Sequence, residues 1–267
     1  MRIILLCFAL IFGLFLVDMP SCVASGGAKA IVVLFEDDPW LMVIGSDSPV
    51  FVLYDDGTVI FAKHRRVGPT EYYVAKLPEQ EKQQLVHSLL DGIGSAQDRY
   101  ELTRATDQPT NIVWVKDGQI QKRVEVYGDL DRDYASFGPS STPAPPKVLS
   151  AFRQLSTFDR IGAKVWLPDY IEVMIWPFPL AREKSIKWPA DWPDLDDPRT
   201  VRRRHIDSIY LRSQHLGELR EMLGKRKPSA AIGISGLKWS VSYRYPFPDE
   251  ETVRAVKMGF RAPLPGE

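Results

Sequence analysis

Residues 230–245 read AAIGISGLKWSVSYRY, and this stretch decides the class of fold that the chain adopts. Ser235-Gly236 is a two-residue turn of the kind that joins antiparallel strands through positive φ angles. Around that turn Ile232 would pair with Trp239 on one face of the sheet, and the intervening polar residues would occupy the other face. Apolar residues that alternate with polar ones are typical of a strand buried on one side only. The stretch therefore predicts a β-hairpin within an antiparallel sheet.

A second hairpin is predicted at residues 52–62, VLYDDGTVIFA, where two adjacent carboxylates precede a glycine. Asp56-Gly57 has the composition of a type I′ turn, in which both residues have positive φ, and such a turn would pair Leu53 with Ile60. An aspartate in a turn accepts hydrogen bonds from its own backbone neighbours. The carboxylates at this reversal are therefore interpreted as turn residues rather than as metal ligands or proton carriers.

A third hairpin is predicted at residues 112–127, IVWVKDGQIQKRVEVY, with Asp117-Gly118 as its turn. Between the hairpins, three segments place apolar residues at helical spacing, which predicts helices packed against the sheets. Hairpins together with such helices predict an α+β fold with antiparallel sheets. The expected helices run from Pro78 to Gly92, onward from Pro146, and from an N-cap at Ser213 to Gly224.

The order of these elements repeats in the two halves of the chain. Strand, strand, helix and hairpin follow one another before residue 138 and again after residue 146. Residues 138–146, GPSSTPAPP, are rich in proline and serine, which favours an extended, solvated linker. We therefore expect two tandem α+β units of similar topology, an N-terminal unit at residues 26–137 and a C-terminal unit at residues 147–267.

Residues 1–25 have the layout of a secretory signal peptide. Arg2 is followed by an uncharged apolar run at residues 3–17 and then by small residues. The run is shorter than the ~20 residues that a helix needs to cross a bilayer, so cleavage is expected rather than retention as an anchor. Cleavage fits best after Ser25, and cleavage after Ala24 or Ala30 is the alternative.

Both cysteines of the chain, Cys7 and Cys22, lie inside this segment. Cleavage after Ser25 would leave a protein without thiols, which excludes disulfides, thiolate nucleophiles and cysteine-bound zinc. A chain of this length buries enough core to fold without disulfides, as exported bacterial proteins do. We therefore expect an exported protein, periplasmic or secreted. The alternative is a membrane anchor, either through the uncleaved segment or through an acylated Cys22.

Composition and motifs argue against several classes of function. Lys and Arg total 34 and Asp and Glu total 34, so no net field recruits nucleic acid. Residues 129–133, DLDRD, begin like a calcium loop, but the glycine and the final glutamate of such a loop are missing. Ser235 and Lys238 have the spacing of a Ser-x-x-Lys acyl transferase, but the serine falls in a hairpin turn. The basic run at residues 199–205 follows several aspartates and is interpreted as a self-neutralised loop. We therefore predict no catalytic residue, no metal site and no cofactor.

The strongest candidate for a contact surface is the long connection at residues 176–198, WPFPLAREKSIKWPADWPDLDDP. It contains Trp176, Trp188 and Trp192, each followed by proline, and long irregular loops often carry function. A tryptophan offers a flat apolar face on which sugars or apolar peptide side chains stack. The alternative interpretation is that these indoles fill the core and fix the loop.

These observations favour a noncatalytic role in binding. The predicted binding residues are Trp176, Trp188 and Trp192, and the expected partner is an envelope protein or a glycan rather than nucleic acid. The alternative is an envelope hydrolase whose carboxylates or serine come together only in the fold.

Overall fold

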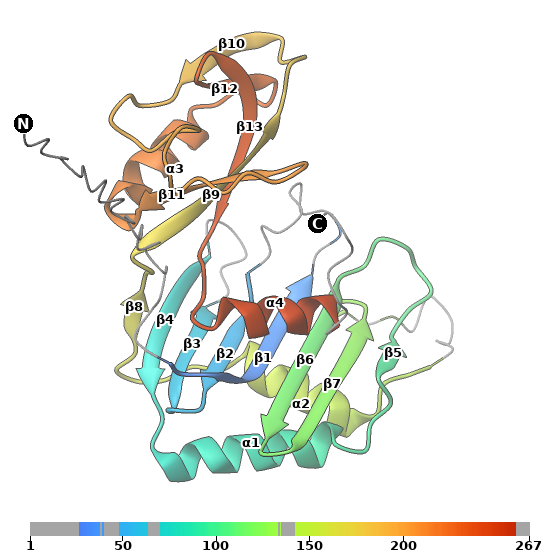
Figure 1. Ribbon diagram of the computed structural model, residues 1–267. Helices are drawn as coiled ribbons and strands as arrows, with labels where there is room; N and C mark the ends of the chain where they lie inside the picture. The colour runs from blue at the N-terminus through green and yellow to red at the C-terminus, as the bar shows by residue number, and fades with distance from the viewer. Residues whose placement is uncertain are drawn as a thin grey trace, which may run out of the picture.

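The computed structural model describes residues 27–37, 39, 48–63, 70–132, 134 and 142–259. Figure 1 shows two sheets, one above the other in this view, with the C-terminal helix crossing the front of the larger sheet. The predicted signal peptide, including Cys22 and the cleavage residue Ser25, lies outside the described residues.

The larger sheet has eight strands in the order β5-β7-β6-β1-β2-β3-β4-β8. Its strand pairs are antiparallel except for β5 with β7. Strands β1 and β6 each have four or more consecutive buried residues, so both faces of the sheet are covered at its centre. The strands are β1 (Ala30–Asp37), β2 (Phe51–Tyr54), β3 (Thr58–Lys63), β4 (Glu71–Lys76), β5 (Arg99–Glu101), β6 (Thr110–Asp117), β7 (Ile120–Tyr127) and β8 (Lys164–Trp166).

The smaller sheet has five strands in the order β10-β12-β13-β9-β11. Its pairs are antiparallel except for β10 with β12. Two sheets dominated by antiparallel pairs, together with four helices, confirm the predicted α+β class. The strands are β9 (Tyr170–Pro177), β10 (Glu183–Lys187), β11 (Asp207–Arg212), β12 (Ala230–Ile234) and β13 (Leu237–Arg244).

Three helices cover the larger sheet. Helices α1 (Glu79–Ile93) and α2 (Pro146–Ser156) pack against each other and against one face, and α4 (Glu250–Met258) crosses β1 and β6 on the other face (Figure 1). The C-terminal carbonyls of α4 are fastened to β7, because Arg123 Nε donates to Val256 O at 2.7 Å and Arg123 Nη2 to Lys257 O at 3.2 Å. Helix α3 (Leu216–Gly224) lies beside the smaller sheet.

The three predicted helices are present, and two of their expected end signals are wrong. Gly92 lies inside α1 rather than at its end; a Cβ there would lie 3.2 Å from Ala151 Cβ, so the glycine lets α2 approach closely. Ser213 does not cap α3, because its hydroxyl donates to Pro168 O and a 3-10 turn, Ser213–His215, separates it from the helix.

The boundary predicted at residues 138–146 does not coincide with the division between the sheets. Helix α2 and strand β8 follow that segment, yet both belong with the larger sheet, and α4 returns to it from the end of β13. The element order does repeat, but the sheets are connected differently. The hairpin β6–β7 joins the larger sheet through its first strand, beside β1, whereas β12–β13 joins the smaller sheet through its second strand, beside β9.

The hairpin at residues 230–245 has the predicted register. Ile234 pairs with Leu237 and Ile232 with Trp239. Ser235 and Gly236 both have positive φ, 47° and 77°, as a type I′ turn requires. The sequence pattern and the backbone therefore agree at this turn.

The hairpin at residues 52–62 has a different register from the predicted one. Val52 pairs with Ile60 and Leu53 with Val59, so the connection has three residues rather than two. Gly57 alone has positive φ, and its N–H donates to Tyr54 O at 2.9 Å. This is a type I turn followed by a left-handed glycine, the other common hairpin connection. The hairpin at 112–127 also turns one residue later than predicted, since Asp117 pairs with Ile120.

Both carboxylates of the turn at residues 55–57 have partners within the protein. The Asp56 carboxylate accepts the Thr58 N–H at 2.8 Å and forms an ion pair with Lys76 Nζ at 2.8 Å. Asp55 Oδ1 accepts the Lys29 N–H at 3.0 Å. The local hydrogen bonding predicted for this turn is therefore present.

Gly57 and Gly118 are a matched pair for testing the turns. Both have positive φ, but a Cβ on Gly57 would lie 2.6 Å from Leu77 O, whereas a Cβ on Gly118 would meet no atom within 4 Å. We expect Gly118→Ala to lower the free energy of unfolding by about 1 kcal/mol, and Gly57→Ala by about 2 kcal/mol or more. Urea unfolding measures the free energy of unfolding of both variants. Equal losses of stability would contradict the close approach of Leu77 to Gly57.

Candidate functional site

The connection at residues 176–198, predicted to be irregular, begins on β9 and contains strand β10. Two of its three tryptophans lie together in the loop that follows β10. The ring centroids of Trp188 and Trp192 are 5.0 Å apart in an edge-to-face arrangement. Trp188 Nε1 donates to Pro193 O at 2.9 Å. Their exposed fractions of 8% and 5% leave little indole face on which a ligand could stack. Trp176 is half-buried on β9.

A pocket of about 500 Å³ opens beside Trp192 and includes this residue in its wall. We call it the Trp192 pocket. The Nε1 atom of Trp192 is buried and has no hydrogen-bond partner among the described residues. The wall combines acidic, basic and apolar side chains, namely Ala190, Asp191, Trp192, Pro193, Asp194, Asp196, Asp197, Arg199, Leu211, Arg212 and His215.

Part of the charge in the Trp192 pocket is already neutralised. Arg199 donates to both carboxylate oxygens of Asp197, from Nε at 3.0 Å and from Nη2 at 2.9 Å. The Arg199 guanidinium thereby lowers the pKa of Asp197 below its ordinary value. Asp194 accepts the Asp196 N–H at 2.9 Å and the Ser235 hydroxyl at 3.3 Å. Asp197 and Arg199 neutralise each other, and the two hydrogen bonds of Asp194 hold the loop in shape.

Three charged groups of the pocket remain available to a ligand. Asp191 and Asp196 are exposed, and neither has an ion-pair partner within the described part of the chain. Arg212 is also exposed, and its guanidinium lies 5.1 Å from the centre of the Tyr170 ring, without an ion pair to any described residue. The pocket thus presents acceptors and a donor side by side.

A histidine completes the wall. The ring of His215 lies 5.5 Å from that of Trp192, and its Nδ1 lies 3.4 Å from Glu218 Oε2. His215 stands in the 3-10 turn that precedes α3, so a short connection in the sequence brings it to the pocket. Sequence reasoning did not select it, because a lone histidine carries no motif.

Three arginines of the basic run at residues 199–205 form ion pairs, but only one of them pairs with the preceding aspartates, as the sequence predicts. Arg199 pairs with Asp197, and Arg202 Nη1 lies 2.9 Å from Asp207 Oδ2. Arg203 Nη1 lies 3.6 Å from Glu172 Oε1. The last two partners lie outside the preceding aspartate cluster and come from strands β9 and β11.

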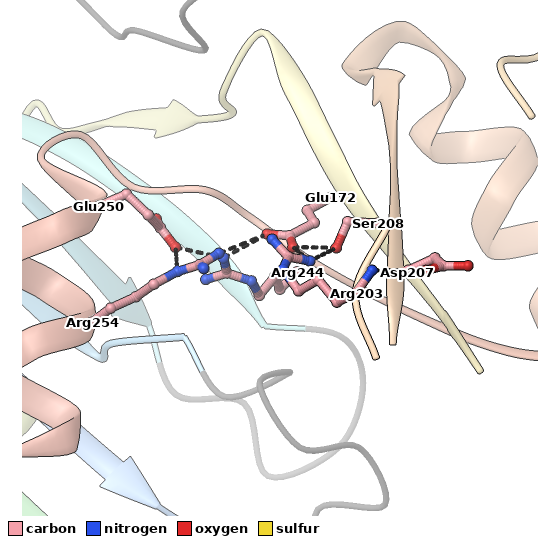
Figure 2. Close-up of polar contacts among 7 residues, drawn as sticks. All are labelled: Glu172, Arg203, Asp207, Ser208, Arg244, Glu250 and Arg254. Carbon is pink, nitrogen blue, oxygen red and sulfur yellow. Dashed lines mark hydrogen bonds and ion pairs between the residues drawn. The ribbon is translucent and has the colours of Figure 1, made fainter. Parts of the chain in front are cut away.

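Glu172 is the centre of a second polar cluster, which we call the Glu172 network (Figure 2). Its side chain is 3% exposed on β9 and lies 2.5 Å from Arg244 Nη2 on β13. Arg254 Nη2 of α4 reaches the same oxygen at 3.3 Å, and Ser208 Oγ donates to the other oxygen at 2.6 Å. Glu250 of α4 completes the network, at 2.5 Å from Arg244 Nη2 and 2.7 Å from Arg254 Nε.

The Glu172 network joins the smaller sheet to α4, which packs on the larger sheet. Burial by itself raises the pKa of the Glu172 carboxyl, but Arg244, the Ser208 hydroxyl, Arg254 and Arg203 outweigh it and hold the pKa below its ordinary value. Ser208 is fully buried, so its hydroxyl meets no substrate. The arrangement is that of a structural ion cluster rather than of a nucleophile with its base.

Aromatic side chains make a second connection between the sheets. The ring of Tyr72 on β4 lies 5.7 Å from that of Tyr245 and 5.2 Å from that of Phe247, both in the connection from β13 to α4. Trp166 on β8 lies 4.8 Å from Phe247. Apolar and ionic contacts therefore fasten the same connection.

Among the described residues no helix is long and apolar enough to cross a membrane. Within the same residues no three His, Cys, Asp or Glu side chains gather as ligands for a metal ion. Comparison of the chain with protein-family models, with curated proteins and with solved structures gives no match.

Proposed function

We propose that this chain is an exported protein of the cell envelope that binds a glycan without catalysis, and that the Trp192 pocket is its contact site. Export is supported by the signal-peptide layout of residues 1–25 and by the absence of cysteine from the rest of the chain. The observation that carries the contact site is the pocket of about 500 Å³, which is lined by Trp192 together with Asp191, Asp196 and Arg212, three charged groups without an ion-pair partner in the described part of the chain.

The chemistry of the pocket favours a ligand with many hydroxyl groups. Carboxylates accept hydrogen bonds and a guanidinium donates them, and a sugar offers both donors and acceptors on neighbouring carbons. Charges of both signs occur in the wall, so the ligand needs no net charge of its own. The polar groups around Trp192 would make these contacts, since the indole itself is almost fully buried.

Three features argue against the hydrolase alternative. A carboxyl that serves as general acid at neutral pH needs burial to retain its proton, whereas Asp191 and Asp196 are exposed. Asp197 has a lowered pKa because Arg199 binds its carboxylate. The buried Ser208 of the Glu172 network is closed to substrate.

The expected result is that one class of oligosaccharide binds, and that Asp191→Asn combined with Asp196→Asn weakens its affinity about tenfold or more, because charged acceptors are lost. Titration calorimetry with neutral, amino and acidic cell-wall oligosaccharides measures this affinity. Glu251→Gln is the matched control, since this carboxylate is exposed on α4 away from the pocket. If no sugar binds, or if the double variant binds as wild type does, the pocket is not a glycan site.

A further inference from the structure

Lys29 and the first residue of β1, Ala30, are hydrogen-bonded to a residue more than two hundred positions later. Lys29 Nζ donates to Asp249 Oδ1 at 3.1 Å, and the Ala30 N–H donates to Asp249 Oδ2 at 3.0 Å. The backbone of Lys29 is also held, because its N–H donates to Asp55 Oδ1 at 3.0 Å and its carbonyl accepts the Asp55 N–H at 2.8 Å. The chain is therefore built into the fold from Lys29 onward.

Asp249 depends on these donors. Its side chain is 4% exposed, and it has a φ of 52°, a left-handed conformation that residues other than glycine seldom adopt. It stands directly before α4, and the neighbouring Pro248 carbonyl accepts the Tyr54 hydroxyl at 3.1 Å. A buried carboxylate that loses its donors is strongly disfavoured. Lys29 and Ala30 thus hold the entry to α4 in place.

The contacts of Lys29 and Ala30 with Asp249 and Asp55, which we call the clamp, also fix the start of strand β1. Ala30 pairs with Tyr54, the first residue pair between β1 and β2. A chain that began at Ile31 would lack this pair, the Lys29 ammonium and both backbone bonds to Asp55. Its new terminal amine would lie one residue further along the strand from the position that the Ala30 N–H occupies beside Asp249.

From this geometry, and resting on the export half of the proposed function, we infer that N-terminal processing stops upstream of Lys29. Hydrolysis of the peptide bond between Ser25 and Gly26 consumes one water and leaves a carboxylate on Ser25 and an amine on Gly26. That cut, or one after Ala24, preserves the clamp. The cut after Ala30, which the small residues of Ala28-Lys29-Ala30 also permit, removes both donors to Asp249.

Thermal unfolding of three chains tests the inference. The chains start at Gly26, Ala28 and Ile31, each released from a tag at its first residue and each continuing to Glu267. We expect the first two to melt together and the third to melt roughly 5–12 °C lower, because several hydrogen bonds to charged groups are lost. If the third chain does not fold, Lys29→Met in the chain from Gly26 gives a smaller fall of roughly 2–6 °C. Equal melting of the Ile31 chain, or of the Lys29→Met variant, overturns the inference.

An Asp249→Asn background assigns the loss to the clamp. In that background we expect the difference between the Ala28 and Ile31 chains to shrink, since the Asp249 carboxylate is gone while the contacts of Lys29 with Asp55 remain. An undiminished difference shows that the loss arises elsewhere and overturns the role of Asp249.

Intact mass of the protein from its native host separates this inference from the export proposal. A chain that starts at Ser25 or Gly26 supports both, and a chain that starts at Ile31 supports export but overturns the inference. A full-length chain that retains Met1 and is recovered from the soluble fraction of the cell interior refutes export, and the melting temperatures then decide whether Lys29 is part of the folded unit.

Discussion

Glu172→Gln is expected to lower the free energy of unfolding by about 3–5 kcal/mol at neutral pH. The glutamate is the buried anion to which Arg244, Arg254 and Ser208 all direct their donors. Arg244 is only 9% exposed, so losing this partner leaves a guanidinium inside the protein that keeps, among the described residues, an ion pair with Glu250 alone. Because the network joins β9 and β13 to α4, the substitution weakens the attachment of the smaller sheet to the helix that packs on the larger one.

Urea unfolding measures this change, and two further variants define its origin. Glu221→Gln removes a carboxylate from an exposed pair with Lys225, and it should leave the unfolding midpoint unchanged. Glu172→Met combined with Arg244→Met removes both buried charges and should recover much of the lost stability. A Glu172→Gln protein as stable as wild type would contradict the structural role of the network.

The same substitution should alter the acid limb of the stability curve. The pKa of Glu172 lies below its ordinary value of 4.5, so its contribution is fully present above that pH in the folded protein. The contribution is lost as pH falls below 4.5 through the lower pKa of the folded state. The difference in stability between wild type and Glu172→Gln should therefore narrow as the pH falls through this range.

Trp188→Ala and Trp192→Ala are each expected to lower the free energy of unfolding by about 3–5 kcal/mol. Both indoles are more than nine-tenths buried, and each forms the other's edge-to-face partner. Their removal would open a cavity beneath the loop at residues 188–199. Loss of ligand binding by such variants would therefore report a damaged fold, which is why the pocket carboxylates are the sharper test of function.

Substitution by phenylalanine separates the two tryptophans. Trp188→Phe removes an indole N–H that donates to Pro193 O, whereas Trp192→Phe removes an N–H that has no partner among the residues the structure describes. We expect Trp188→Phe to be less stable than Trp192→Phe by about 1 kcal/mol in urea unfolding. Equal stability, or the reverse order, would contradict the different roles assigned to the two indole nitrogens.

Local sequence patterns predict hairpins better than they predict register. At residues 230–245 the turn Ser235-Gly236 and the alternation agree, so both the turn and the pairing are correct. At residues 52–62 an Asp-Gly pair fits both a two-residue turn and a three-residue turn with a left-handed glycine. The three-residue turn brings Gly57 close to Leu77, which follows strand β4. The sequence around the turn does not reveal this approach.

The apolar stripes predict α1, α2 and α3 but not α4, although α3 and α4 are both nine residues long. The stripe of α3 is visible because it contains leucines and a methionine, whereas α4, EETVRAVKM, has only two valines, an alanine and a methionine among charged residues. The position of α4 depends on distant partners, with Arg123 at its C-terminal end and Lys29 at its start. Propensity has little influence on such a helix, because tertiary packing supplies most of its stability.

The candidate site was predicted only in part. The tryptophan-rich loop directs attention to the region of the proposed Trp192 pocket, but the sequence does not reveal that Trp188 and Trp192 turn inward while Asp191 and Asp196 face the solvent. Glu172 has a visible signal, a lone carboxylate in the apolar run YIEVMIWP. Its three arginine partners come from β13, α4 and the loop before β11, so only the fold identifies them.

The most direct test of the central claim is a nitrogen–proton correlation spectrum of the isotope-labelled protein during titration with cell-wall oligosaccharides. We predict shifts that cluster at the backbone of Asp191, Asp196 and Arg212 and at the indole N–H of Trp192, with the residues around Glu172 unaffected. Shifts centred on another surface, or a spectrum that no oligosaccharide changes, would contradict the assignment of the Trp192 pocket as a glycan-binding site.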